Sequence, residues 1–429
     1  MVADPGTEAG RAAKHAAVSI GTRTAAPVRK PWRSFWFGRF EVAEARDGLH
    51  QLRDWLQPAP CEVAADKLPG GGARLRDLAF FRHGFVKPAW SSFPQPVADA
   101  PRDAQDLMFW QFPCRTEAAA FDAHARLDCA GASPGEMHCY LGLPWATWLD
   151  KQRVDAGQAQ LEPVLQIAGV RLSGLRHALA ALGVGLRVHT VCQHIRARDL
   201  FSLWRRLGVT DLWWSHATAG DLRAPGPAGL GIHPWSLYAV NVEDPLRRDG
   251  LTPGRDPAER SILASFAGVH LAHYLSDVRL RLRGLAAEPG FEIRVTEDRW
   301  HFEHVVYEHQ VQGRALAPAR EAEASVAGYN RMLSDSVFAL CPAGAGPNSL
   351  RLWEALAAGA IPVLLGPPPA LPQGGSLPGI TWDDIVLTVP DAALGELPRR
   401  LRSLGIGELR RRQRLGLQAY RLVQSQCCF

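Results

Sequence analysis

The sequence predicts an α/β protein built from two Rossmann-like domains that face each other across a cleft. In two stretches of the 429-residue chain, apolar strand-like runs alternate with helical patterns, which is typical of parallel sheets. A polar run rich in Pro and Gly, residues 244–256, separates these stretches and marks a domain junction. We therefore expect an N-terminal domain over residues 29–250 and a C-terminal domain over residues 251–429.

The composition is that of a globular protein, with 47% hydrophobic and 21% charged residues. Residues 1–28 are rich in Ala, Gly, Thr and basic residues without periodicity, which predicts a disordered lead. The net charge of +5 does not indicate a nucleic-acid partner. Because the sequence shows neither an 18-residue apolar run nor a signal pattern, we expect a soluble cytoplasmic protein without an integral membrane segment. Eight scattered cysteines without metal-ligand spacing predict free thiols.

In the first domain, residues 185–192 and 209–214 are expected to form strands on either side of a helix over residues 197–207. His194 and His216 follow the two strands directly. The carboxyl ends of parallel strands form the edge where ligands bind in open α/β sheets. His216 is therefore a candidate for the cleft, and a buried structural histidine is the alternative.

The second domain shows the same alternation of strand and helix patterns. Strands are expected over residues 262–266, 292–295 and 385–389, with a turn at 267–268. A basic amphipathic helix over residues 271–285 would carry Asp277, and a further helix over 321–333 would carry Tyr329. The arginine-rich helix over residues 398–415 is expected to have a solvated face.

Residues 337–365 hold the most informative unit of the chain. A strand over 337–341 is followed by a turn over 343–347, a helix starting after Asn348 or Ser349, and a strand over 361–365. Gly359 occupies the place of a left-handed C-terminal cap. Helix N–H groups and the helix dipole would suit a phosphate there, with Arg351 as a forked donor and Glu354 as a partner for a ribose diol. An ordinary unit with an Arg–Glu pair on a solvated face is the alternative.

The turn Cys-Pro-Ala-Gly at 341–344 and the run SLRLWEALAAGAIPV at 349–363 resemble the donor-site motif of the exostosin family of glycosyltransferases (GT47). Residues 262–268 resemble the strand and glycine turn that open the same domain. The resemblance covers residues 258–366 and is thin before residue 185. Because the sequence shows no anchor pattern, we expect a soluble member of bacterial type. The matching positions are Cys341, Pro342, Gly344, Ser349, Arg351, Glu354, Ala355, Leu356, Gly359, Ile361, Pro362 and Val363.

This resemblance implies the GT-B architecture, with an acceptor-side N-terminal domain and a C-terminal domain that binds a nucleotide sugar, a UDP-sugar first among the candidates. The sugar would pass to a glycan or another hydroxyl acceptor, with inversion and no cofactor. Since the chain contains no Asp-x-Asp, we expect a metal-independent reaction that relies on fixed donors. His216 is the leading candidate for the general base and Asp277 the second. The donor-binding candidates are Gly268, Gly344, Asn348, Ser349, Arg351 and Glu354.

Two other functions stay open. A non-catalytic nucleotide- or carbohydrate-binding protein could keep the same fold. A metal-dependent hydrolase would use His301, His304 and His309, although their spacing is not that of H-E-x-x-H. The string Gly-Ala-Ser-Pro-Gly at 131–135 matches G-x-S-x-G, but Pro134 has no N–H to donate to an oxyanion.

Overall fold

The computed structural model describes residues 114–124, 136–151, single positions between 165 and 183, and residues 185–223, 229–245, 247–296, 320–372 and 379–424. All of them lie in one compact unit, Phe37–Phe429. The predicted lead at 1–28, the string at 131–135 and the histidines at 301, 304 and 309 lie outside the described residues.

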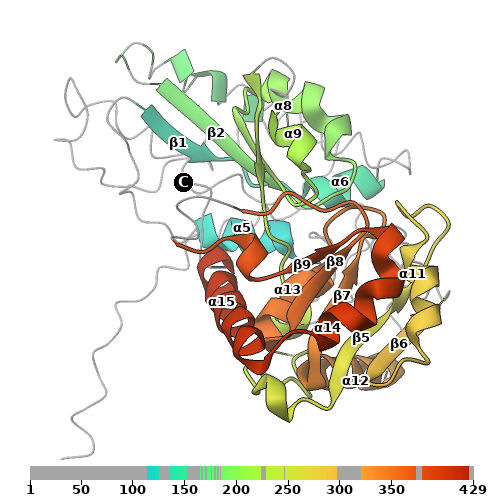
Figure 1. Cartoon of the computed structure of the whole chain (residues 1–429). Helices are drawn as coiled ribbons and strands as arrows, with labels where there is room; N and C mark the ends of the chain where they lie inside the picture. The colour runs from blue at the N-terminus through green and yellow to red at the C-terminus, as the bar shows by residue number, and fades with distance from the viewer. Residues whose placement is uncertain are drawn as a thin grey trace, which may run out of the picture. The chain divides into compact units, whose positions relative to one another are not determined.

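The first domain is organised around a four-stranded parallel sheet (Figure 1). Its strands are β1 (Glu136–Tyr140), β2 (Gly185–Cys192), β3 (Asp211–Trp214) and β4 (Gly231–Pro234), in that spatial order. Strand β2 has the predicted bounds. The predicted helix over 197–207 is a 3₁₀ turn, η4 (Ala197–Leu200), that continues as α8 (Phe201–Leu207).

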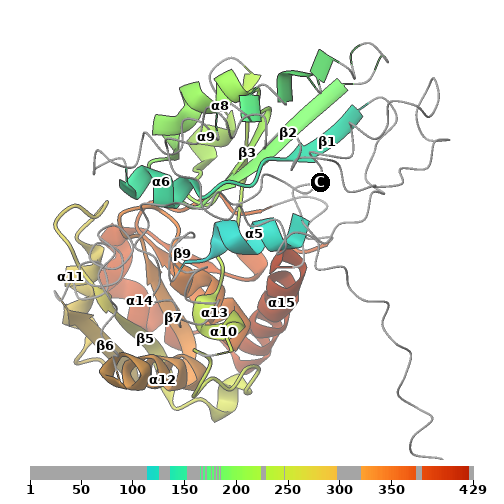
Figure 2. The ribbon, with the colours of Figure 1, turned by 180° about the vertical axis from the view of Figure 1, so that it is seen from behind.

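Alternate residues of these strands face two different layers. Val188 of β2 and Leu212 of β3 lie in a core with Trp204 of α8, because side chains two apart share one face of a strand. On the other face, Val191 and Tyr140 pack against α5 (Thr116–His124) (Figure 2). Two further helices, α6 (Trp145–Lys151) and α9 (Ala219–Arg223), belong to this domain.

The second domain has a five-stranded parallel sheet in the order β6-β5-β7-β8-β9. The strands are β5 (Ile262–Val269), β6 (Phe291–Thr296), β7 (Ser336–Pro342), β8 (Ile361–Leu365) and β9 (Leu387–Val389). The chain leaves β5 on one side to form β6 and returns to its other side to form β7. The strand order therefore reverses between β5 and β7, and in such sheets ligands bind outside the carboxyl ends of the strands at this switch point.

Helices cover both faces of this second sheet (Figure 1). On one face lie α12 (Arg320–Asp335), α13 (Leu350–Ala358) and α15 (Ile406–Gln424), whose Leu333, Trp353 and Tyr420 share a core with Ala339. On the other lie α11 (Val278–Arg281), η7 (Leu282–Leu285) and α14 (Leu397–Arg402). The remaining short helices are α10 (Val240–Glu243), η6 (Pro257–Glu259), η10 (Trp382–Asp384) and η11 (Asp391–Glu396).

Two parallel sheets with helices are the architecture that the sequence predicts, and they are consistent with a GT-B-like fold. The chain passes from one sheet to the other between β4 and β5. Leu237 and Ala239 already pack in the core of the second domain, and α10 lies beside α13 (Figure 2). Within the described part of the chain, no helix combines the length and hydropathy needed to cross a membrane.

Several predicted elements of the second domain have other bounds. The turn expected at 267–268 is wrong, because both residues belong to β5 and pair with β6. The single helix expected over 271–285 is also wrong, since helical structure starts only at Val278. Before it, the N–H of Leu275 donates to the Gly344 carbonyl (2.9 Å) and ties this segment to the loop after β7. The arginine-rich segment forms two helices, α14 and α15.

Candidate functional site

The loop after β7 and the helix that follows it have the predicted form. The β7–α13 loop (residues 343–349) leads into α13, and Gly359 ends the helix at φ 73°, the left-handed conformation that favours glycine. Ser349 is the residue before the first turn, with an extended backbone (φ −137°, ψ 148°), and its side chain makes no capping hydrogen bond. The N-terminus of α13 therefore opens at the switch point without a side-chain cap.

Arg351, in the first turn of α13, turns its guanidinium back towards β5. It donates a hydrogen bond to the Ala267 carbonyl and lies 4.4 Å from the centre of the Phe266 ring. Its Nε is buried without a hydrogen-bond partner. Gly268 makes room for this side chain, since a Cβ there would lie 2.9 Å from the Arg351 Nη2. The structure thus brings two predicted site residues, Gly268 and Arg351, into contact.

A second guanidinium, that of Arg279 in α11, lies beside the first. It donates to the carbonyls of Val269 (2.7 Å), Ala343 (3.1 Å) and Pro342 (3.2 Å), and so holds the ends of β5 and β7 together. A Cβ on Gly344 would lie 2.9 Å from its Nη2. The sequence pattern does not indicate this role, because Arg279 is one of several basic residues on the expected helix.

The two arginines create a positive site. Both guanidinium groups lie over Phe266, at 4.4 Å for Arg351 and 5.7 Å for Arg279. Burial, together with the nearby positive charge of Arg351, lowers the pKa of Arg279 to about 10. Within the described ranges, no carboxylate lies at ion-pair distance from either guanidinium. Two close positive charges beside an uncapped helix N-terminus favour an anion.

Glu354, one turn after Arg351, faces the protein interior. Its side chain accepts a hydrogen bond from the Tyr329 hydroxyl (2.8 Å) and a long one from the Asn241 N–H (3.4 Å). Burial raises the pKa of both Glu354 and Tyr329. The alternative of an Arg–Glu pair on a solvated face is wrong, because Glu354 is only 3% exposed. Its contact with a ribose stays a prediction, and the carboxylate already has two protein partners.

The β7–α13 loop also touches the first domain. The Asn348 amide donates to the Ser215 carbonyl (2.7 Å), and its oxygen accepts from the indole N–H of Trp353 (3.0 Å). A Cβ on Gly346 would lie 2.4 Å from His216 Nδ1. The structure therefore places His216, at the end of β3, directly against the predicted donor-binding loop.

The two predicted bases differ in their surroundings. Burial lowers the pKa of His216 to about 3, so its imidazole is neutral at pH 7, and its Nδ1 has no hydrogen-bond partner. Asp277 is exposed, precedes α11 without capping it, and lies two residues after the Leu275 that bonds to the same loop. His216 thus contacts the β7–α13 loop, whereas Asp277 is two residues from a backbone bond to it, and the choice between them stays a prediction.

Glu117 of α5 is a buried carboxyl at the corresponding edge of the first sheet that sequence analysis did not find. It accepts hydrogen bonds from the N–H groups of Ala146 (3.1 Å) and Gln193 (3.0 Å), and burial raises its pKa to about 8. Nearby, His194 Nε2 lies 3.1 Å from an oxygen of Asp150. These contacts join residues up to 76 positions apart, so no local pattern could predict them.

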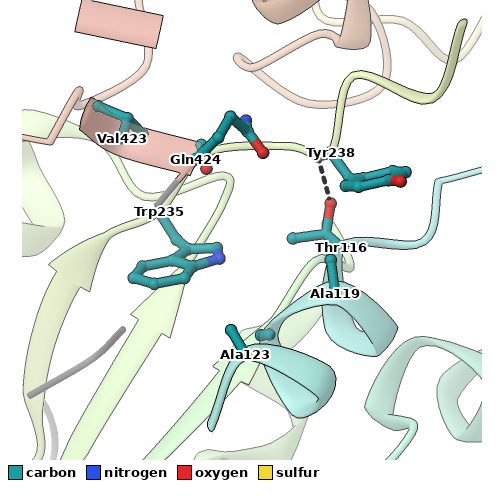
Figure 3. Close-up of a pocket in the computed structure, with 9 residues that line it drawn as sticks. Thr116, Ala119, Ala123, Trp235, Tyr238, Val423 and Gln424 are labelled. Atoms are coloured by element: carbon teal, nitrogen blue, oxygen red, sulfur yellow. Dashed lines mark hydrogen bonds between the residues drawn. The ribbon is translucent and has the colours of Figure 1, made fainter. Parts of the chain in front are cut away.

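In the described ranges, no group of three His, Cys, Asp or Glu side chains is placed to hold a metal ion. Figure 3 shows a small pocket between α5, the segment after β4 and the end of α15, where the Tyr238 N–H donates to the Thr116 hydroxyl (2.7 Å). No predicted site residue lines it. Its lining consists of Thr116, Ala119, Ala120, Ala123, Trp235, Ser236, Tyr238, Val423 and Gln424.

The second domain is similar to domains of known proteins. A family model described as the exostosin GT47 domain matches residues 238–404. A "Probable glucuronosyltransferase" of Oryza sativa subsp. japonica is 38% identical over 87 residues, which are 20% of this chain and 19% of the relative. The "Probable glucuronoxylan glucuronosyltransferase IRX7" of Arabidopsis thaliana is 41% identical over 71 residues, 17% of this chain and 15% of the relative.

A third relative, the "Probable beta-1,4-xylosyltransferase IRX10" of Arabidopsis thaliana, is 34% identical over 87 residues, 20% of each chain. The matched segments thus span a fifth or less of these relatives. Among solved structures, the one titled "Crystal structure of GtfA/B complex" is similar at a TM-score of 0.31 and 12% identity, over 62% of this chain and 57% of that chain.

The second domain is therefore similar to glycosyltransferase domains. More particularly, residues 238–404 match the exostosin GT47 domain, the family that the motif around Arg351 resembles. The motif, the switch point and the pair of arginines coincide in this domain.

Proposed function

We propose that the protein is a glycosyltransferase that moves a sugar from a nucleoside-diphosphate sugar to an acceptor hydroxyl. The observation that carries this proposal is Arg351, a guanidinium with an unpartnered buried Nε at the uncapped N-terminus of α13. The family match of the domain and the plant glycosyltransferases that share part of it support the same reaction class.

The diphosphate of the donor would bind where α13 starts. Ser349 and the first N–H groups of the helix would contact phosphate oxygens, and Arg351 would add a forked, charge-assisted bond. Arg279 would contribute its charge while it holds the loop, since its donors already serve backbone carbonyls. These groups are fixed before the reaction, so they can stabilise the charge that develops on the leaving diphosphate without a metal ion.

In the proposed transfer, the acceptor oxygen forms a bond to the anomeric carbon as the bond from that carbon to the diphosphate breaks. The hydroxyl proton passes to a general base, His216 or Asp277, and the configuration inverts. A base with a pKa of about 3 is weak, so His216 would need its surroundings to change when substrates bind.

The sugar and the nucleotide are proposed from relatives alone. The names of the plant relatives mention glucuronosyl and xylosyl transfer, so UDP-glucuronate and UDP-xylose are the first donors to test, with glycans as acceptors. Soluble cytoplasmic location and a bacterial type of enzyme stay predictions.

A thermal-shift screen against UDP, GDP, dTDP, ADP and CMP, each with EDTA, tests the donor site. A nucleotide at 100 times its dissociation constant should stabilise the native state by about 2.7 kcal/mol. We expect at least one nucleotide to raise the Tm of the wild type. If none does so with or without added divalent ions, the proposed donor site is wrong.

A further inference from the structure

We infer that Asn348 is a positioning residue that couples nucleotide binding in the second domain to the His216 segment of the first. This inference rests on the proposed function, because it takes the β7–α13 loop as part of the donor site. It assigns the Asn348 side chain a task other than contact with the donor.

The argument starts from the two hydrogen bonds of the Asn348 amide. Its Nδ2 donates to the Ser215 carbonyl (2.7 Å) at the end of β3, and its Oδ1 accepts from Trp353 Nε1 (3.0 Å) in α13. Asn348 is 4% exposed, so both bonds are shielded from water. Trp353 is fully buried and fixes the amide orientation, which leaves the donor end directed at the other domain.

A second contact lies two residues earlier in the same loop. Gly346 is packed so closely on His216 and Ile195 that a Cβ would lie 2.4 Å from His216 Nδ1 and 2.7 Å from Ile195 Cγ2. Glycine is therefore needed for this approach. His216 and Ser215 are neighbours in the sequence, so the loop holds one short segment of the first domain at two points.

The same loop also adjoins the positive site. Gly344 lies against Arg279, and Ser349 precedes the helix turn that contains Arg351. A nucleotide bound there would order the loop, and the loop would in turn order residues 215–218. His216 Nδ1 makes no hydrogen bond and packs against Gly346, so a displacement of the loop would also displace this imidazole. Through its hydrogen bond to the Ser215 carbonyl, the Asn348 side chain would link the order of the loop to the order of residues 215–218 in the first domain.

Hydrogen-exchange mass spectrometry of the full chain tests the coupling, with UDP, GDP, dTDP or ADP as the probe. In the wild type, a nucleotide that slows exchange in residues 343–351 should also slow exchange in residues 211–218 several-fold. In Asn348→Ala, protection of 343–351 should persist while protection of 211–218 is lost. Asn348→Asp should behave like Asn348→Ala, because it keeps an acceptor for Trp353 but cannot donate to Ser215.

Asn330→Ala is the matched control. Asn330 is another buried asparagine, and it donates two hydrogen bonds, to the carbonyls of Arg247 (2.8 Å) and Asp249 (2.9 Å). Both carbonyls lie after β4, in the stretch whose Leu237 and Ala239 pack in the second core. Asn330→Ala should therefore destabilise the protein yet leave the spread of protection to residues 211–218 intact.

The possible failures are distinct. If no nucleotide protects residues 343–351 of the wild type, the donor site is wrong and the coupling falls with it. If a nucleotide protects 343–351 but never 211–218, or if both Asn348 variants keep the spread of protection, the donor site stands and the role of Asn348 is refuted.

Discussion

Replacement of Arg351 by alanine is the perturbation that tests the donor site at a single side chain. The guanidinium has one backbone partner, the Ala267 carbonyl, and a buried Nε without one. A hydrogen bond to a charged group contributes about 1.5–3 kcal/mol, and truncating one partner of a buried charge pair costs about 2–5 kcal/mol. Because Arg279 and the helix N-terminus remain, we expect Arg351→Ala to weaken the binding free energy of the nucleotide by about 2–3 kcal/mol, near the lower end of this range.

Isothermal titration of the stabilising nucleotide in EDTA measures this loss. A change of 2–3 kcal/mol corresponds to a Kd weaker by roughly 30- to 150-fold. Arg351→Lys keeps the charge without the fork, so its Kd should lie between those of the wild type and Arg351→Ala. Arg399→Ala is the control, since the Arg399 side chain is 84% exposed and lies on a different helix.

An unchanged Kd in a folded Arg351→Ala protein would refute this reasoning. The variant also loses its packing on Phe266, so its Tm and far-UV circular dichroism must show that the fold persists. A Kd within twofold of the wild type would mean that the phosphates bind elsewhere. An equal loss in Arg399→Ala would mean that the effect is not specific to the site.

Three further predictions concern stability, each measured by urea unfolding. Gly346→Ala should lower the free energy of unfolding by about 1–3 kcal/mol, since its Cβ would overlap His216. Gly328→Ala in α12 is the control, because there is open space around Gly328, and it should be neutral or stabilising by up to ~1 kcal/mol. Equal effects of the two variants would contradict the close contact at Gly346. Gly359→Ala should cost about 1–2 kcal/mol because φ is 73°, and an unchanged midpoint would argue against the left-handed cap. The third prediction concerns pH. Burial lowers the pKa of His216 from 6.5 to about 3 in the folded protein. Between these two pH values the unfolded state binds a proton that the folded state does not, so the stability of the protein falls as the pH falls. From pH 7 to 5, His216→Gln should therefore lose about 2 kcal/mol less than the wild type, and parallel pH profiles would show that His216 is not held neutral.

Local signals in the sequence predicted the centre of the second domain correctly. The apolar run at 361–365, with Pro362 near its start, forms β8, and Gly359 caps α13 as expected. These features depend on neighbours in the sequence: a short apolar stretch, a helix-breaking residue and a left-handed glycine. The strand over 185–192 was predicted for the same reason.

The errors arose where tertiary contacts override the local pattern. Residues 271–277 have helical character in the sequence, but the bond from Leu275 to Gly344 holds them as a loop. Gly268 reads as a turn residue, yet β5 continues through it because β6 pairs with it and Arg351 needs the space of its side chain. Periodicity within one segment cannot reveal a partner 70 residues away.

In the candidate site, too, local patterns predicted some residues, while tertiary contacts determine others. The motif located Ser349 and Arg351, because helix starts and forked donors follow from adjacent residues. It could not show that Asn348 reaches Ser215, that Arg279 holds the loop, or that Glu117 is buried at the edge of the first sheet. These roles depend on how the two sheets and their helices are placed.

The central claim is that the site transfers sugars and does not merely bind nucleotides. The most direct test is ³¹P NMR of nucleoside diphosphate release from UDP-glucuronate, UDP-xylose and other nucleotide sugars in EDTA, with mixed oligosaccharide acceptors. We predict that the wild type releases the diphosphate from at least one donor and that Arg351→Ala does so far more slowly. A folded wild-type protein that binds the nucleotide but leaves every donor intact would contradict the claim and favour a non-catalytic binding protein.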